Sequence, residues 1–202
     1  MLIRVNSENP QPRLIQRVVK ILKEGGVIAY PTDTVYGLGC DLYQKKAIER
    51  IHQIKRTDPH RPFSFICSDL RDIGLYALVS NYAYKTMKRL LPGPYTFVLP
   101  ATRLVPKIMV TRRKTVGIRV PDHPISLALV RELSRPIIST SATLPDKQIL
   151  YDPAEIQEHL GKVLNLVIDG GILASEPSSV IDLTEEPPKV LRPGKGDVSI
   201  FL

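Results

Sequence analysis

Hydrophobic residues recur at helical spacing in several segments of the chain. In the first of them, Leu14, Val18 and Leu22 form one stripe, and the glycine pair at 25–26 follows as a stop signal. Such stripes let a helix bury one face against a core. Helices are therefore expected over residues 12–24, 46–54, 81–91, 125–133 and 154–160.

Short apolar runs between these stripes, several of them ended by proline, predict strands over residues 27–30, 63–67, 96–99, 115–120, 136–139, 164–168, 179–183 and 189–191. Residues 55–62 and 143–152 are expected to be loops. Strands and helices are mixed along the chain, which favours one α/β (α+β) domain over residues 1–202 with a single twisted, open, mixed sheet.

The segment GGVIAYPTDTVYGLG, residues 25–39, combines a buried strand with a polar loop. Pro31 cannot donate to a sheet, so it ends the strand, and Thr32, Asp33 and Thr34 follow at once. Hydroxyls and a carboxylate at the end of a buried strand are typical of a ligand site. The structural alternative is a turn in which these side chains only cap the backbone. The residues from Tyr36 to Gly39 are expected to lead out of the loop.

Composition narrows the class of protein. The chain has 202 residues, 43% of them hydrophobic, but no apolar run approaches the roughly 18 residues that cross a bilayer. The N-terminus lacks a signal-peptide layout, so a cytoplasmic protein without a membrane partner is expected. The two cysteines, Cys40 and Cys67, and four scattered histidines predict neither disulfides nor a bound metal.

The net charge of +8 favours an anionic partner such as a nucleotide or RNA. One stretch is especially basic, and if it covered one face it would attract phosphate. A solvated loop is the structural alternative. The stretch holds Lys85, Lys88, Arg89, Arg103, Lys107, Arg112, Arg113 and Lys114.

Ordered motifs identify a family. PTDTVYGLG, a lysine-bearing loop with Pro62, PGPYTFVLP, VGIRVPDHP, STSA, SSVIDLT and LRPG follow one another along the chain. Together they resemble the threonylcarbamoyl-adenylate synthase family, or YrdC/YciO-like family, over residues 25–194, and their wording is most similar to the YciO branch. The resemblance implies one twisted α/β domain of the YrdC/RibB type with a basic concave face.

The resemblance also implies a reaction. Its members join L-threonine, bicarbonate and ATP into threonylcarbamoyl-AMP and pyrophosphate, for modification of an adenosine in tRNA. Such nucleotidyl transfer needs no protein nucleophile, so no catalytic side chain is expected. Positioning and charge stabilisation suffice, with Mg²⁺ arriving on ATP rather than at a protein metal site.

Carried over to this sequence, the resemblance assigns an amino-acid site to Thr34, Arg119, Ser139 and Ser178. An arginine fork suits a carboxylate because two parallel N–H donors match its two oxygens. The structural alternatives are a salt bridge of Arg119, for example with Asp122, and helix or turn capping by the serines.

The nucleotide side departs from the family pattern. The resemblance assigns it Lys55, Thr115, Ser141 and Arg192. Arg61 stands where the family has asparagine and is a candidate to reach the same phosphate. The arginine of the family's KxR motif is Thr57 here. The family's Ser-x-Asn reads Ser-Ala-Thr in residues 141–143, and its Ser-Gly continuation reads Pro-Asp in residues 145–146. Losing one charged phosphate donor costs about 1.5–3 kcal/mol. Weak synthesis of threonylcarbamoyl-AMP is therefore expected.

Two other functions stay open. The basic face could bind double-stranded RNA or tRNA without catalysis, through phosphates rather than base stacking, because aromatic residues make up only 6% of the chain. A related carbamoyl-phosphate-type chemistry, as in hydrogenase maturation factors that contain this domain, would require partner domains, and it is therefore the less expected function here.

Overall fold

A single mixed sheet runs through the computed structural model, which describes residues 1–58, 62–109, 113–173 and 176–201. The strand order is β1-β8-β2-β3-β7-β4-β6-β5-β9-β10. The strands are β1 (Leu2–Arg4), β2 (Ile28–Tyr30), β3 (Gly37–Asp41), β4 (Ser64–Ile66), β5 (Tyr95–Pro100), β6 (Thr115–Arg119), β7 (Ile137–Ser141), β8 (Leu166–Asp169), β9 (Ser179–Asp182) and β10 (Lys189–Arg192).

The sheet contains both parallel and antiparallel pairs. β1 and β2 both pair in parallel with β8, and β4–β6 and β5–β9 are also parallel. The pairs β2–β3, β3–β7, β4–β7, β5–β6 and β9–β10 are antiparallel. The expected α/β fold with one mixed sheet is thereby confirmed.

The helices are α1 (Pro12–Lys23), α2 (Lys45–Lys55), α3 (Leu70–Tyr76), α4 (Asn81–Leu90), α5 (Pro124–Leu133) and α6 (Pro153–Leu160). Local signals start them: Asp69 caps α3, Ser80 caps α4 and Asp152 caps α6, each by accepting backbone N–H groups. In the described part of the chain no helix is long and apolar enough to cross a membrane.

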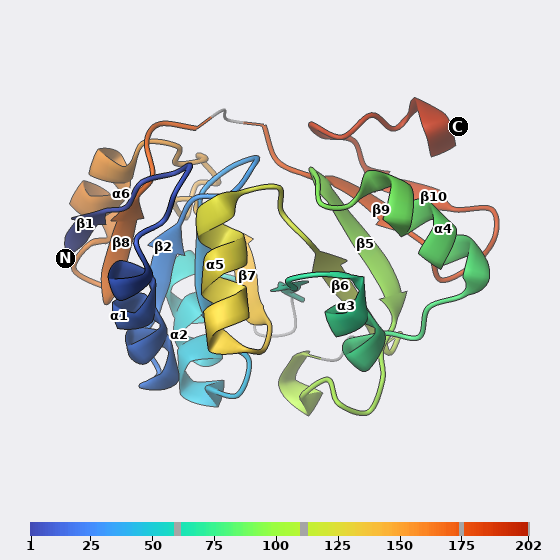
Figure 1. Ribbon diagram of the computed structural model, residues 1–202, viewed down its shortest axis with the longest axis horizontal. Helices are drawn as coiled ribbons and strands as arrows, with labels where there is room; N and C mark the ends of the chain where they lie inside the picture. The colour runs from blue at the N-terminus through green and yellow to red at the C-terminus, as the bar shows by residue number, and fades with distance from the viewer. Residues whose placement is uncertain (59–61, 110–112, 174–175, 202) are drawn as a thin grey trace.

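The two faces of the sheet are covered differently. On one face, α1 and α5 pack over Ile28 and Tyr30 of β2 and over Leu166 and Ile168 of β8. Figure 1 shows these two helices side by side in front of the strands. The opposite face carries the larger core, in which α2, α3, α4 and α6 bury their apolar stripes. Because side chains alternate along a strand, one strand can contribute side chains to the cores on both faces of the sheet.

Beyond α5, no helix among the described residues covers the central strands on the first face, and the side chains there become small and polar. Gly117 of β6 lies between Ser64 of β4 and Val98 of β5, while Thr96 and Ser178 follow toward β9. The reverse sides of the same strands are apolar, with Phe65, Phe97, Val116, Ile118 and Ile181 in the core. This switch from apolar to polar residues on one face creates the cleft described below.

Among the strands and α-helices of the described residues, β1, β3 and α3 were not expected from the sequence. The stretch 37–41 was expected to lead out of a loop, yet it is a fully buried strand between β2 and β7. Its two glycines lower strand propensity and so conceal the strand. A smaller correction concerns Lys55, which is the last residue of α2 and not part of the following loop.

Candidate functional site

A cleft of about 320 Å³ opens on the uncovered face of the sheet. Its floor and walls come from the segments around β3 to β7, β9 and β10, and its lining mixes hydroxyls, glycines and two arginines. Most of the predicted site residues line it, namely Thr115, Arg119, Ser139, Ser141, Ser178 and Arg192. Thr34 and Lys55 adjoin it through hydrogen bonds, and Arg61 lies outside the described residues.

Two glycines of β3 make room for the Tyr30 ring, which lies across this strand. A Cβ at Gly39 would come within 2.8 Å of the ring, and one at Gly37 within 3.1 Å. The Tyr30 hydroxyl thereby reaches β7 and donates to Ser139 Oγ at 2.7 Å. The ring thus fixes the rotamer of a serine that lines the cleft.

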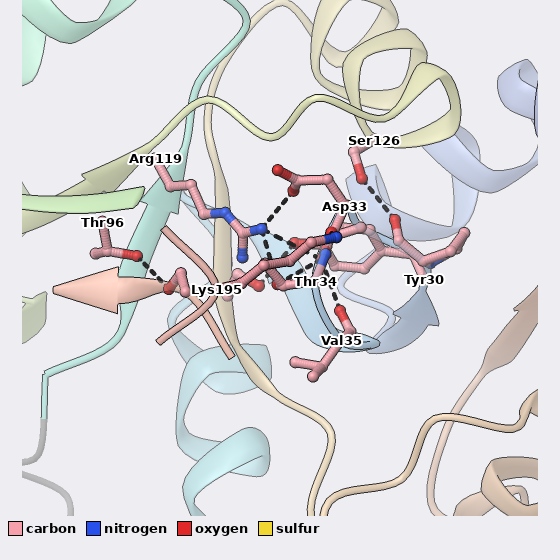
Figure 2. A network of polar contacts seen from close by, with 12 residues as sticks. Tyr30, Asp33, Thr34, Val35, Thr96, Arg119, Ser126 and Lys195 are labelled. Carbon is pink, nitrogen blue, oxygen red and sulfur yellow. Dashed lines mark hydrogen bonds and ion pairs between the residues drawn. The ribbon is translucent and has the colours of Figure 1, made fainter. Parts of the chain in front are cut away.

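The centre of the polar network is Arg119, at the end of β6 (Figure 2). Its Nη2 donates to the Asp33 carboxylate, to Thr34 Oγ1 at 2.8 Å and, more weakly, to Thr32 Oγ1 at 3.5 Å. Only 8% of the Arg119 side chain and 10% of the Asp33 side chain are exposed. The ion pair that the sequence suggested with Asp122 is therefore made with Asp33.

This pair keeps unused hydrogen-bonding capacity. Arg119 Nε and Asp33 Oδ2 are buried and have no partner among the described residues. Buried polar atoms normally find partners, so an unpaired donor beside an unpaired acceptor suits a ligand that carries both kinds of group. An amino acid, with an amine and a carboxylate, has that chemistry.

Burial raises the pKa of the Tyr30 hydroxyl to about 12, although its bond to Ser139 and the nearby Arg119 lower it. Because the unfolded chain ionises near pH 10, this term stabilises the fold below pH 10 and is lost as the pH rises toward 12. Between pH 9 and 11 the wild-type protein should lose about 1 kcal/mol more of its free energy of unfolding than the Tyr30→Phe variant does. Urea unfolding at both pH values measures this, and equal losses in the two proteins would contradict it.

A second cationic group lies at the β7 end of the cleft. Lys55 Nζ, at the end of α2, donates to the Ser141 carbonyl and to Thr143 Oγ1, both at 2.6 Å. Arg192 donates from β10 to the Ser178 carbonyl at 2.7 Å. Arg56 adopts a left-handed conformation as the C-cap of α2, so this stretch is not extended. Lys55 and Arg192 therefore bring positive charge to opposite walls.

The basic stretch that the sequence singled out does not form one face with the cleft. Its first three residues lie on α4, which packs with Ala83 and Met87 in the core on the opposite side of the sheet. Arg113 instead lines a hollow that continues the cleft past Thr115. Arg112 lies outside the described residues.

Sequence reasoning missed several residues of the site. The sequence indicated only a strand position for Tyr30, and it placed Thr96 and Ser64 within apolar runs. No sequence pattern pointed to Lys195. Thr96 Oγ1 and Ser178 Oγ are 2.8 Å apart, so a predicted residue is held by one that was missed. Alternation with a period of two in residues 115–119 was the available signal for the cleft-facing side of the neighbouring strand.

A family model described as telomere recombination, Sua5/YciO/YrdC, matches residues 20–194. The chain belongs to the Sua5/YciO/YrdC family. Among its members, the chain is 45% identical over 201 residues to an uncharacterized protein of Haemophilus influenzae, covering 98% of this chain and 97% of the relative. It is 44% identical to the uncharacterized protein YciO of Escherichia coli K12, over 98% and 97% of the two chains.

A third relative has a named activity. The threonylcarbamoyl-AMP synthase of Vibrio vulnificus is 35% identical over 184 residues, covering 89% of this chain and 98% of that protein. These matches confirm the resemblance to the YrdC/YciO-like family and to its YciO branch.

Solved structures of the Sua5/YciO/YrdC family share the fold. The crystal structure of E. coli YciO superposes with a TM-score of 0.96 at 44% identity, covering 100% of this chain and 99% of YciO. Sua5 of P. abyssi, crystallised with L-threonine, superposes with a TM-score of 0.90 at 33% identity, covering 96% of this chain and 57% of Sua5.

Proposed function

We propose that this protein synthesises threonylcarbamoyl-AMP from L-threonine, bicarbonate and ATP, at a low rate. The observation that carries the proposal is the buried Arg119, which has an unpaired donor in a cleft of hydroxyls. Relatives support it, because a 35% identical protein is named as this synthase and a related Sua5 was crystallised with L-threonine.

The chemistry makes limited demands on the protein. The threonine amine adds to carbon dioxide derived from bicarbonate and loses a proton, which gives a carbamate. A carbamate oxygen then attacks the α-phosphorus of ATP, and the bond from that phosphorus to the bridging oxygen breaks and releases pyrophosphate. Every step is accelerated by holding the reactants in line and by stabilising anionic oxygen atoms.

Each wall of the cleft then has a role. Arg119 and Thr34 bind the amino-acid carboxylate, with Ser139 and Ser178 as further hydroxyl contacts. Lys55, Ser141, Thr115 and Arg192 face the nucleotide. Lys55 now holds protein oxygen atoms at 2.6 Å, so it would release Thr143 to contact a phosphate.

Mg²⁺ belongs to the substrate in this proposal. Among the residues that the structure describes, no group of three His, Cys, Asp or Glu could hold a metal ion. The donor set of the cleft therefore fits MgATP, in which the phosphates carry the ion, better than a protein-bound metal. Mg²⁺ would neutralise the departing pyrophosphate.

The low rate follows from the altered phosphate motif. Thr57 stands where the family has an arginine, and its side chain lies 3.3 Å from His52 Nδ1. Arg56, held in the left-handed cap, does not replace it by simple register. Loss of one charged phosphate donor is expected to cost one to two orders of magnitude in rate or affinity, about 1.5–3 kcal/mol.

Pyrophosphate release from ATP tests the proposal. We expect release that requires both L-threonine and bicarbonate, with Lys55→Met raising the KM for ATP about tenfold or more and leaving the KM for threonine within about twofold. The expected product is identified by mass spectrometry. Pyrophosphate release that does not depend on threonine, or no release above that of buffer alone, would refute the proposed synthase activity. Salt-sensitive binding of duplex RNA without any release would favour the RNA-binding alternative instead.

A further inference from the structure

The backbone that follows β10 is fixed against the rim of the cleft. Lys195 N donates to the Pro177 carbonyl at 2.9 Å, and Ser179 Oγ donates to the Gly196 carbonyl at 2.6 Å. A Cβ at Gly194 would come within 2.4 Å of the Pro177 carbonyl, and one at Gly196 within 2.5 Å of the Tyr95 ring. Close backbone packing on both sides of Lys195 sets the direction in which its side chain leaves the chain.

That side chain points across the cleft to the first loop. Lys195 Nζ donates to the backbone carbonyl of Asp33 at 2.6 Å, and Figure 2 shows it extending toward Asp33 beside Arg119 and Thr34. The residue is exposed, and its bond is to a neutral oxygen. An ammonium group binds an anionic oxygen more strongly than a neutral carbonyl, so this contact can be exchanged for one to a ligand.

The groups around Arg119 lack the second positive charge that a dianionic ligand would need, and Lys195 can supply it. Arg119 carries one positive charge, which Asp33 already balances, and Thr32 and Thr34 are neutral. A free amino acid is a zwitterion, but once its amine carries a carboxylate the molecule is a dianion. Burying a dianion beside a neutral pair is costly unless another cation contacts it.

We propose that Lys195 binds the N-carboxylate of the carbamoylated amino acid, while Arg119 and Thr34 bind its α-carboxylate. This inference rests on the proposed function and names a further residue of the same site. Lys195 is then a specificity residue that distinguishes an N-carboxylated amino acid from the free one. It also shields the rim of the cleft, where the carbamate would otherwise return to carbon dioxide and amine.

Two stable mimics test the charge requirement by calorimetric titration. N-oxalyl-L-threonine carries a second carboxylate on the carbonyl group attached to its nitrogen, and N-acetyl-L-threonine carries a methyl group there. We expect Lys195→Met to weaken binding of the oxalyl compound about tenfold and binding of the acetyl compound less than twofold. Lys195→Arg should restore most of the affinity for the oxalyl compound. Lys162→Met, which removes an exposed lysine after α6, is the matched control and should change neither affinity.

Kinetics provide the second readout. Lys195→Met should raise the KM for bicarbonate about tenfold and leave the KM for ATP within about twofold. If the wild-type protein is active but Lys195→Met weakens the affinity for both mimics equally, or for neither, only the role of Lys195 is overturned. A wild-type protein that binds neither mimic and releases no pyrophosphate would overturn the amino-acid site and this inference together.

Discussion

Arg119→Met is expected to lower the free energy of unfolding by about 3–5 kcal/mol and to abolish activity. The variant leaves the Asp33 carboxylate, of which 10% is exposed, without its partner, and it removes the bond to Thr34. A buried, uncompensated charge accounts for most of the loss. Adding Asp33→Asn removes that charge, so the double variant should recover at least half of the stability but no activity. Urea unfolding and pyrophosphate release measure the two effects.

The ion pair of Arg135 and Asp41 provides a matched control. Arg135 donates Nε to Asp41 Oδ1 at 2.8 Å and Nη2 to Oδ2 at 2.5 Å, and the Asp41 side chain is fully buried. This pair does not line the cleft. Arg135→Met should destabilise the fold by a comparable amount yet keep the activity of the folded fraction. If Arg119→Met costs less than 1 kcal/mol, the account of a buried uncompensated charge is wrong. If both variants lose activity equally, the binding role of Arg119 is wrong.

The second large effect is expected for Gly39→Ala, which should cost about 1–3 kcal/mol. The new methyl group would come within 2.7 Å of Ile137 Cγ2 and 2.8 Å of the Tyr30 ring, both in the core. The ring must shift, so the Tyr30–Ser139 bond breaks and a wall of the cleft moves. Urea unfolding and the KM for threonine should therefore change together.

A double-mutant cycle separates crowding from glycine's backbone effect. In a Tyr30→Ala background the contact with the ring is gone, so Gly39→Ala should cost at least 1 kcal/mol less than in the wild-type chain. Gly74→Ala is the matched control, because no atom lies within 4 Å of its Cβ position in α3 and alanine favours the helix by roughly 0.5–1 kcal/mol. Additive costs at positions 30 and 39 would contradict the steric account.

Sequence reasoning recovers the elements whose signals are local. The stripe of α1 and its glycine stop place a helix correctly over most of 12–24, and proline ends β2 where expected. Most of the site residues predicted from the family motifs also line one cleft. Their roles toward ligands stay predictions.

The failures have a common physical cause. β3 contains glycines because a ring from the neighbouring strand needs the space, and only the pairing of β2 with β3 shows this. Asp33 rather than Asp122 pairs with Arg119 because the loop after β2 folds over the end of β6. Lys195 is equally hidden, since its contact with Asp33 joins residues 162 positions apart.

That separation has a consequence for how the molecule acquires its activity. The walls of the cleft come from the first loop, the middle strands and the final strand of the chain, so the cleft cannot form on a partly synthesised chain. Such long-range pairing slows folding. Ligand binding should therefore appear only in the last folding phase, and a chain shortened before β10 should retain its helices yet bind no ligand.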